Sequence, residues 1–427
     1  MLSHVIYLGI VYALIFTGFY TLNGFLTLIF PSYAFIGFSI YYGTYALSCL
    51  VAPYIISRLN IRWCIIISGF IYVLYIGFIS SKMIPLFLVA CGITGLVHSF
   101  IWLSQGLLLS KYPDNTRNTY ISIFFGILCS NIIFGNLISL IILLTGVDIQ
   151  QMIWVLMAIT FIGAVMSIFI LPFSFGQLSY LKSQEVTHHT SLVDSIKRVF
   201  TIVGTNRGYL LIPLIMLQAF DVNVSIQILS RLLIVNATTI GSSSAGVYTA
   251  AMYLVYGFSA LTSSFFLGKL YDKFGWKSIL ISYSILQAIA ITGIMLISKL
   301  SSNGPLGLWI TISFLKGITD NAIVVMINIS IYRVYKEKSD LMLAFYRFTF
   351  AIVYVIGSVM VGYISYEWIL LTDGIFIILS IIAYSFFHID NIEEQFNKST
   401  VNLADLVKRN EQIQLHDPYH AHLATIV

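Results

Sequence analysis

The sequence has few charged residues, and their scarcity excludes an ordinary water-soluble globular protein. Only 9% of the 427 residues are Asp, Glu, Lys or Arg, whereas 59% are hydrophobic, and the mean hydropathy is +0.93. Soluble domains carry about 25% charged residues. A folded chain of this composition needs lipid around it, so the sequence predicts an integral membrane protein.

Motifs for catalysis and for nucleic-acid binding are also missing. The sequence contains no G-x-S-x-G, no H-E-x-x-H and no phosphate-binding glycine loop. The net charge of +5 is spread along the chain and forms no basic patch. The four cysteines lack C-x-x-C spacing and matching histidines. We therefore predict a protein that is not an enzyme, that has no metal or cofactor, and that does not bind nucleic acid.

Long apolar runs predict the fold class. A membrane-spanning helix needs about 20 mostly apolar residues, and twelve runs of this kind are bounded by charges, prolines or polar clusters. They cover residues 5–30, 35–57, 63–80, 84–110, 118–145, 151–174, 209–235, 244–268, 277–298, 305–332, 341–365 and 368–389. The sequence thus predicts an all-α integral membrane protein with twelve spanning helices.

A polar segment divides the twelve runs into two sets of six. We expect an N-terminal six-helix bundle over residues 1–175, a central loop over residues 176–208, a C-terminal six-helix bundle over residues 209–389 and a tail over residues 390–427. Seventeen of the 22 Lys and Arg lie in the tail and in the connections after even-numbered helices, against three on the opposite side. Because cytoplasmic loops carry the excess of Lys and Arg, both termini are predicted to be cytoplasmic. Asn236, in an Asn-Ala-Thr triplet on the far side, is then the candidate for N-glycosylation.

The connection after the eighth helix, Gly268 to Lys277, reads G-K-L-Y-D-K-F-G-W-K. It resembles the G-x-L-x-D-R/K-x-G-R/K-R/K loop signature of the major facilitator superfamily, with a departure at Trp276. Matching positions include Gly268, Asp272, Lys273 and Gly275. The connection after the second helix has Ser57 and Asn60 in place of the acid and the second glycine. The resemblance implies a major facilitator superfamily-type bundle made of two six-helix repeats.

Four stretches of the first half carry a more specific pattern. They are Leu8–Phe25, Tyr45–Pro53, Ile101–Leu109 and Asn118–Asn136. They resemble the UNC-93 family of major-facilitator-type proteins, whose fourth helix commonly ends in Trp-x-x-Gln-Gly, here Trp102, Gln105 and Gly106, and whose fifth helix carries Gly-Asn, here Gly135 and Asn136. Members of that family are described as regulatory subunits of potassium channels or as trafficking partners of membrane receptors. The resemblance therefore implies a regulatory role.

Three charged residues lie deep in the predicted helices of the second half. Lys316 and Asp320 are four residues apart near the middle of the tenth helix, so they share a face and can pair. Asp221, near the middle of the seventh helix, has no cation within a turn. It needs a partner from another helix, for which Lys316 is the natural candidate, or a protonated carboxyl. These residues form either a structural ion pair or a cavity site that couples to ions or protons.

Other polar residues lie on helices 1 and 4, which line the central cavity, with helices 7 and 10, in the major facilitator fold. They are Asn23, His98 and Gln105. His98 is either a hydrogen-bond donor between helices or a proton relay. Arg347 is expected to reach the membrane interface or to pair near the Gly268 loop, and Asp373 is expected to reach water.

Two functions remain open. The first is a non-enzymatic regulatory or trafficking subunit of an ion channel or membrane receptor, which the UNC-93 resemblance implies. The second is a secondary transporter of a small, uncharged solute coupled to protons through Asp221 or Asp320, because the first half has no charge at depth to grip a charged ligand. The last residues, Ala424–Val427, fit the Thr-x-apolar-carboxylate ending that PDZ domains bind by strand addition.

Overall fold

The computed structural model describes residues 2–110, 112, 114–170, 191–232, 242–299, 306–335 and 338–387. The chain divides into two compact units, Met1–Ser385 and Phe386–Val427. Almost all of the second unit lies outside the described residues, so the fold below is that of the first. Its described part is helical throughout, without a β-strand.

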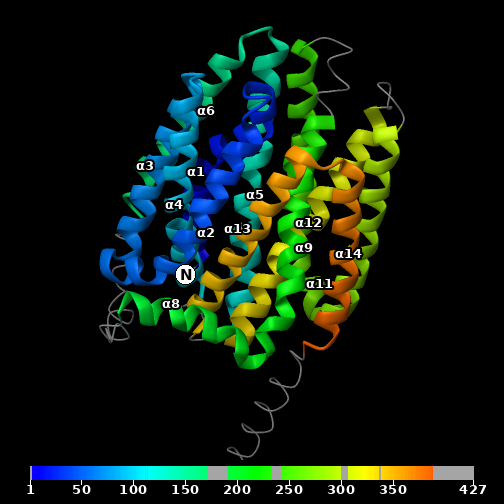
Figure 1. The fold of residues 1–427 in the computed structure, drawn as a ribbon. Helices are drawn as coiled ribbons and strands as arrows, with labels where there is room; N and C mark the ends of the chain where they lie inside the picture. The colour runs from blue at the N-terminus through cyan, green and yellow to red at the C-terminus, as the bar shows by residue number, and fades with distance from the viewer. Residues whose placement is uncertain are drawn as a thin grey trace, which may run out of the picture. The chain divides into compact units, whose positions relative to one another are not determined.

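The helices of the first unit follow one another with short connections. Their bounds are α1 Leu2–Ile29, α2 Ala34–Leu59, α3 Ile61–Ser80, α4 Ile84–Ser110, α5 Asp114–Leu144, α6 Ile149–Ser167, α8 Leu192–Thr201, the 3-10 helix η2 Ile202–Leu211, α9 Ile212–Asn223, the π-helix η3 Val224–Ile228, α11 Ser242–Lys299, α12 Leu306–Tyr335, α13 Ser339–Tyr363 and α14 Tyr366–Ser385. Figure 1 shows most of them running side by side along one direction. A helix of 20 residues is about 30 Å long, the thickness of the bilayer's hydrocarbon core.

Twelve segments are long and apolar enough to cross a membrane, and they match the twelve predicted runs with ends that differ by a few residues. The chain is therefore an integral, multi-pass membrane protein. Two of the segments, Ala245–Leu267 and Lys273–Ile297, belong to α11, which is interrupted at Gly275 with φ 73° and ψ 160°. Glycine adopts this left-handed φ without steric cost, so the loop signature places it where the chain turns back.

A turn of the same kind, at Asn60, connects α2 with α3. Asn60, which replaces the glycine, has φ 70° and ψ 144°, and its side chain accepts a hydrogen bond from the Arg62 backbone at 3.4 Å. Asparagine tolerates positive φ better than other residues with a side chain. The substitution seen in the sequence thus preserves the backbone turn.

Close helix packing also recurs in the two halves. A Cβ atom added to Gly95 of α4 would collide with the Tyr41 carbonyl of α2, and one added to Gly317 of α12 would collide with the Tyr256 carbonyl of α11. Small residues let spanning helices approach this closely. Three residues after each glycine comes a candidate site residue, His98 after Gly95 and Asp320 after Gly317.

Two helix pairs make most of the contact between the first six spans and the last six. The helix α2 packs along α13, and α5 packs along α11. Within the first six spans α1 contacts α5 and α6, and within the last six α9 contacts α13 and α14. The space between the joined pairs contains the candidate site.

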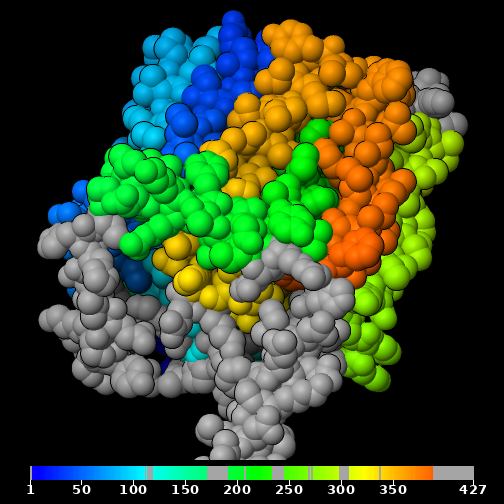
Figure 2. Space-filling view, turned by 60° about the horizontal axis from the view of Figure 1, so that its bottom comes forward, coloured from blue at the N-terminus to red at the C-terminus, as the bar shows by residue number. Residues whose placement is uncertain are grey.

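The helix α8 lies in the segment that the sequence analysis treated as a loop. Its sequence is amphipathic, and Ser191 caps it by accepting a hydrogen bond from the Asp194 backbone at 3.1 Å. The helix contacts α2 and α13, and the Phe200 ring packs edge-on against Phe348 with centroids 5.4 Å apart. Figure 2 shows α8 and η2 as a green band across this end of the unit.

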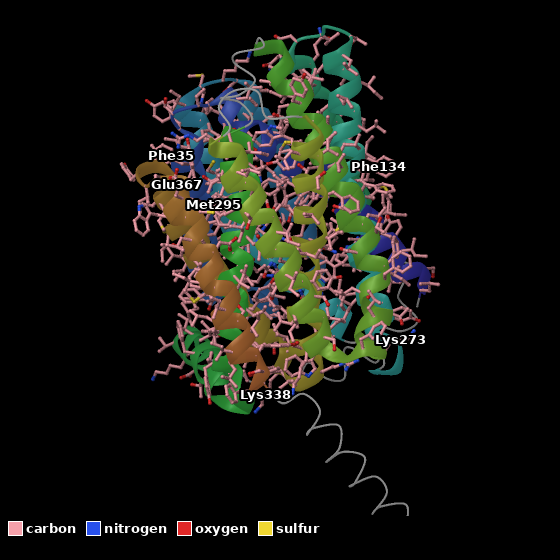
Figure 3. The ribbon with its side chains drawn as sticks, turned by 90° about the vertical axis from the view of Figure 1, so that its right-hand side faces the viewer. Phe35, Phe134, Lys273, Met295, Lys338 and Glu367 are labelled. Carbon is pink, nitrogen blue, oxygen red and sulfur yellow. The ribbon has the colours of Figure 1, made fainter. Side chains whose placement is uncertain are left out.

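The outward faces of the spans are apolar. Figure 3 shows side chains projecting from them, including Phe134, which is 58% exposed. Lys273 and Lys338 lie at one end of the unit, and Phe35 and Glu367 lie toward the other. The connections after the eighth and tenth spans therefore share one end, as alternate spans require. Which end faces the cytoplasm stays a prediction.

Candidate functional site

Buried charges gather between α9 and α12. The Lys316 ammonium forms an ion pair with Asp221, and its Nζ lies 3.2 Å from Asp320 Oδ1. All three side chains are buried. The contacts expected from the sequence, one along α12 and one to the seventh span, are both present. The cluster thus brings two carboxyl groups to one ammonium group.

The second oxygen of Asp320 is also occupied. Asp320 Oδ2 accepts hydrogen bonds from Ser225 Oγ at 2.6 Å and from the Tyr256 hydroxyl at 2.8 Å. Ser225 lies in η3, where the seventh span adopts π-helical geometry. A π-helical turn re-aims the side chains of a helix and occurs frequently at functional sites. The turn thus helps to place the Ser225 hydroxyl against the carboxylate.

The hydrogen-bond network continues away from Asp320 to a fourth helix. Gln287 of α11 donates to Asp221 and, at 3.1 Å, to Asp373 Oδ2 of α14, while Thr319 donates to Gln287 Oε1 at 2.7 Å. Asp373 is fully buried. The expectation that Asp373 reaches water is therefore wrong, because α14 packs against α9 and α11 and turns this side chain inward.

A cavity of about 150 Å³ lies between the two halves. Aromatic rings supply much of its wall. Its lining includes Tyr20, Tyr42, Tyr45, His98, Trp102, Phe125, Asn131, Gln218, Tyr256, Asp320, Asn321, Arg347 and Phe350. These residues come from α1, α2, α4 and α5 and from α9, α11, α12 and α13. The cavity therefore lies where the major facilitator resemblance places it.

Arg347 is the largest departure from the sequence analysis. Its side chain neither reaches the membrane interface nor pairs near the Gly268 loop. It is 8% exposed and lines the cavity, with its guanidinium carbon 4.6 Å from the ring centroids of both Trp102 and Tyr346. Such contacts are cation–π interactions. The face of α13 that carries Arg347 is turned to the cavity because α13 packs between α2 and α9.

His98 of α4 also lines the cavity and lies among aromatic rings. Its Nδ1 shares a hydrogen bond with the Tyr72 hydroxyl, and its ring centroid lies 4.5 Å from that of Tyr45. The side chain is 5% exposed. His98 and Asp320 thus both face the cavity, from corresponding turns of α4 and α12.

The remaining candidates lie outside the cavity wall. Asn23 is buried and accepts a hydrogen bond from the Tyr75 hydroxyl at 3.2 Å, which ties α1 to α3. Gln105 is buried, and its Nε2 has no partner among the described residues. The next residue, Gly106, packs against Leu343 of α13. The Trp-x-x-Gln-Gly element therefore sits where α4 meets the second half.

Some predicted positions lie partly or wholly outside the described residues. Asn236 is one, as is the tail with Ala424–Val427. In the loop signature, Gly268 and Asp272 have a described backbone but no described side chain, whereas Lys273 is exposed. Across the described part of the chain, no group of three or more His, Cys, Asp or Glu could hold a metal ion.

The arrangement offers titratable groups in contact with a cavity. Asp320 faces the cavity, and hydrogen bonds and ion pairs connect it through Lys316 and Asp221 to Gln287 and Asp373. Sequence reasoning missed Gln287, although it interrupts the apolar run between Lys277 and Lys299. It also missed Ser225 and Tyr256, whose roles depend on which helices meet and carry no signal in the sequence.

A comparison with models of known families found a match. The family model described as ion channel regulatory protein UNC-93 matches residues 27–387. The match covers eleven of the twelve spans completely, together with the end of the first. A comparison with curated proteins found no match.

Proposed function

Because the chain belongs to the UNC-93 family, we propose that it is a non-enzymatic regulatory or trafficking subunit of an ion channel or membrane receptor. The observation that carries this proposal is the match to a family of ion channel regulatory proteins over residues 27–387. Twelve membrane spans give such a subunit a large apolar surface on which to meet a partner within the bilayer. The lipid bilayer itself is the other partner that these faces require.

The buried charges fit this role as structural elements. Lys316, Asp221 and Gln287 join α9, α11 and α12, and Asp373 adds α14. In some proteins buried ionic groups fix which helices meet, even where they add little stability. A second half held in one arrangement presents a fixed surface to a partner and needs no bound solute.

The test is native purification of the tagged chain, at its own expression level, in mild detergent. The expected result is a channel or receptor recovered in near-equal amount by quantitative mass spectrometry. The control is an unrelated tagged multi-pass protein from the same membrane, which should not recover that partner. Recovery of the chain alone, folded and monodisperse, would contradict the proposal.

A truncated variant tests whether the partner binds the membrane spans or the tail. Removal of Ala424–Val427 deletes the ending that PDZ domains accept. If the partner binds the spans, this truncated chain still recovers it in the same amount. If a PDZ protein is recovered by the full chain and lost with the truncation, the tail is a separate contact.

One observation favours a second candidate, a proton-coupled secondary transporter of a small solute. Asp320 faces the cavity and is connected to Asp221 through Lys316, and the two predicted six-helix halves offer repeats that can rock about such a site. In proteoliposomes, solute uptake driven by a pH gradient should then be lost in Asp221→Asn and Asp320→Asn while surface expression in cells persists. Unchanged uptake in both variants would exclude coupling through these carboxyls.

A further inference from the structure

Arg347 is a buried cation without an anionic partner in the described part of the chain. Its side chain is 8% exposed, and its described contacts are the rings of Trp102 and Tyr346. Lys316, by contrast, contacts two carboxylates. A buried charge is costly unless it is paired and hydrogen-bonded. The guanidinium is thus a charged donor whose natural partner has to come from the cavity that it lines.

Other residues that line the cavity carry uncharged hydrogen-bond donors that also have no acceptor in the described part of the chain. Trp102 and Asn131 line the cavity, and the buried Trp102 Nε1 and the buried side-chain amide of Asn131 have no hydrogen-bond partner among the described residues. Buried polar groups in native proteins are nearly always hydrogen-bonded. Arg347 is the charged donor among the residues that line the cavity, and it favours a ligand that brings acceptor oxygens.

Asp320, the carboxylate that lines the cavity, does not supply the missing acceptor. Asp320 is already bonded by Ser225 and Tyr256 and paired with Lys316. Arg347 is the one Lys or Arg side chain among the described residues that line the cavity, and it can balance one negative charge on a ligand. The wall therefore favours one negative charge over two.

The remaining wall sets the size and polarity of the ligand body. Aromatic rings of Tyr42, Phe125 and Phe350 line the cavity. Its volume of about 150 Å³ is that of a protein cavity known to hold benzene. A body of roughly one ring fits this space.

We propose that the cavity binds a small monocarboxylate with a compact apolar body, its carboxylate held by Arg347 and its body among the aromatic rings. The planar guanidinium matches the two oxygens of a carboxylate. Ligand sites generally combine apolar walls with a few polar groups that fix orientation. The inference replaces the sequence-based expectation of an uncharged solute, and it applies equally to a regulatory subunit that senses a ligand and to a transporter.

The test uses the purified full-length protein in detergent, with benzoate as the probe and protein-free micelles as the blank. Isothermal titration calorimetry should give saturable binding of benzoate. Benzyl alcohol, which lacks the charge, and phthalate, which carries two charges, should bind at least about tenfold more weakly. No saturable benzoate binding, or equal affinity for benzyl alcohol, overturns the proposal without any variant.

Variants then locate the site. Arg347→Gln should weaken benzoate binding at least about tenfold, and Arg347→Lys, which keeps the charge but not the planar fork, should fall between Gln and wild type. Arg58→Gln removes an exposed guanidinium of α2 and is the matched control, with binding unchanged. Size-exclusion elution shows whether each variant is folded. Wild-type affinity in a folded Arg347→Gln overturns the assignment of the carboxylate to Arg347.

Discussion

The Lys316 ammonium lies 3.2 Å from the Asp320 carboxylate, one helical turn along α12, and it also forms an ion pair with Asp221 of α9. All three groups are buried. The pair along α12 can form within one helix, whereas the pair with Asp221 forms only when α9 and α12 are docked. Lys316 therefore couples the charge balance of the cluster to the packing of the second half.

We predict that Lys316→Met destabilises the protein strongly, because it leaves two buried carboxylates without their cation. Removing one partner of a buried ion pair typically costs about 3–5 kcal/mol. The double variant Lys316→Met/Asp221→Asn removes one of those carboxylate charges and should recover part of the loss. The measurement is the thermal unfolding midpoint in detergent, followed by fluorescence-detected size exclusion.

Lys338→Met is the control for this prediction, because Lys338 is exposed at the end of the unit. The thermal unfolding midpoint of Lys338→Met should equal that of the wild type. A Lys316→Met variant that melts with the wild type, or a double variant that melts lower than the single one, contradicts a structural role for the pair.

The packing of Gly317 against α11 yields a second prediction. A Cβ at this position would collide with the Tyr256 carbonyl and the Ser259 hydroxyl, so Gly317→Ala should push α12 away from α11. Overpacking of this kind costs about 1–3 kcal/mol. Because Tyr256 also lines the cavity, the variant should lower the unfolding midpoint and weaken benzoate binding together.

Gly374→Ala is the matched control. No atom lies within 4 Å of the Cβ that it would add to α14, and alanine favours a helix over glycine by about 1 kcal/mol. Its unfolding midpoint should equal or exceed that of the wild type. If both alanine variants behave alike, the close approach at Gly317 has no energetic consequence.

Much of the fold could be predicted from the sequence, because a spanning helix must be apolar over its whole length. The twelve runs and their order follow from that requirement, and the turn at Gly275 follows from the glycine of the loop signature. The helix α8 was missed because its pattern covers only ten residues among many charges. Hydropathy has no signal for such a short amphipathic helix.

The site was less predictable, because its chemistry depends on how helices rotate. The pairing of Lys316 with Asp221 could be anticipated, since few buried charges exist to choose from. Arg347 could not be placed, because an arginine near the end of an apolar run can equally reach the membrane interface or the cavity. Gln287 looked unremarkable, since an amide in an apolar helix has no unique partner until α9 and α14 are docked on it.

Gln287 gives the third prediction, since it donates to two buried carboxylates. Gln287→Leu conserves much of the volume but removes both donated hydrogen bonds, to Asp221 and to Asp373. Leaving a buried acceptor unsatisfied costs about 1–3 kcal/mol, and more for a charged group. The unfolding midpoint should therefore fall. Gln151→Leu, at an exposed position of α6, serves as control and should be neutral.

A further change distinguishes lost hydrogen bonds from poor packing at Gln287. Asp373→Asn in the Gln287→Leu background removes one of the two carboxylates that lost a donor, so part of the midpoint should return. If the double variant is no better than Gln287→Leu alone, the loss comes from the shape of leucine and the hydrogen bonds to Asp373 matter little.

The cap of α8 gives the last prediction. Ser191 accepts from the Asp194 backbone and satisfies one of the free N–H groups at the start of this helix. Ser191→Ala should cost about 1 kcal/mol of helix stability.

Because α8 packs on α2 and α13, which belong to different halves, fraying of α8 should loosen a contact between the halves. Hydrogen exchange measured by mass spectrometry should then accelerate over residues 192–201 and leave α4 unchanged. Ser191→Thr keeps a hydroxyl that can accept from the Asp194 backbone and donate to Asp194 Oδ2, so exchange should stay close to the wild-type rate. Equal exchange in all three proteins would mean that contacts such as Phe200 with Phe348, and not the cap, hold α8 in place.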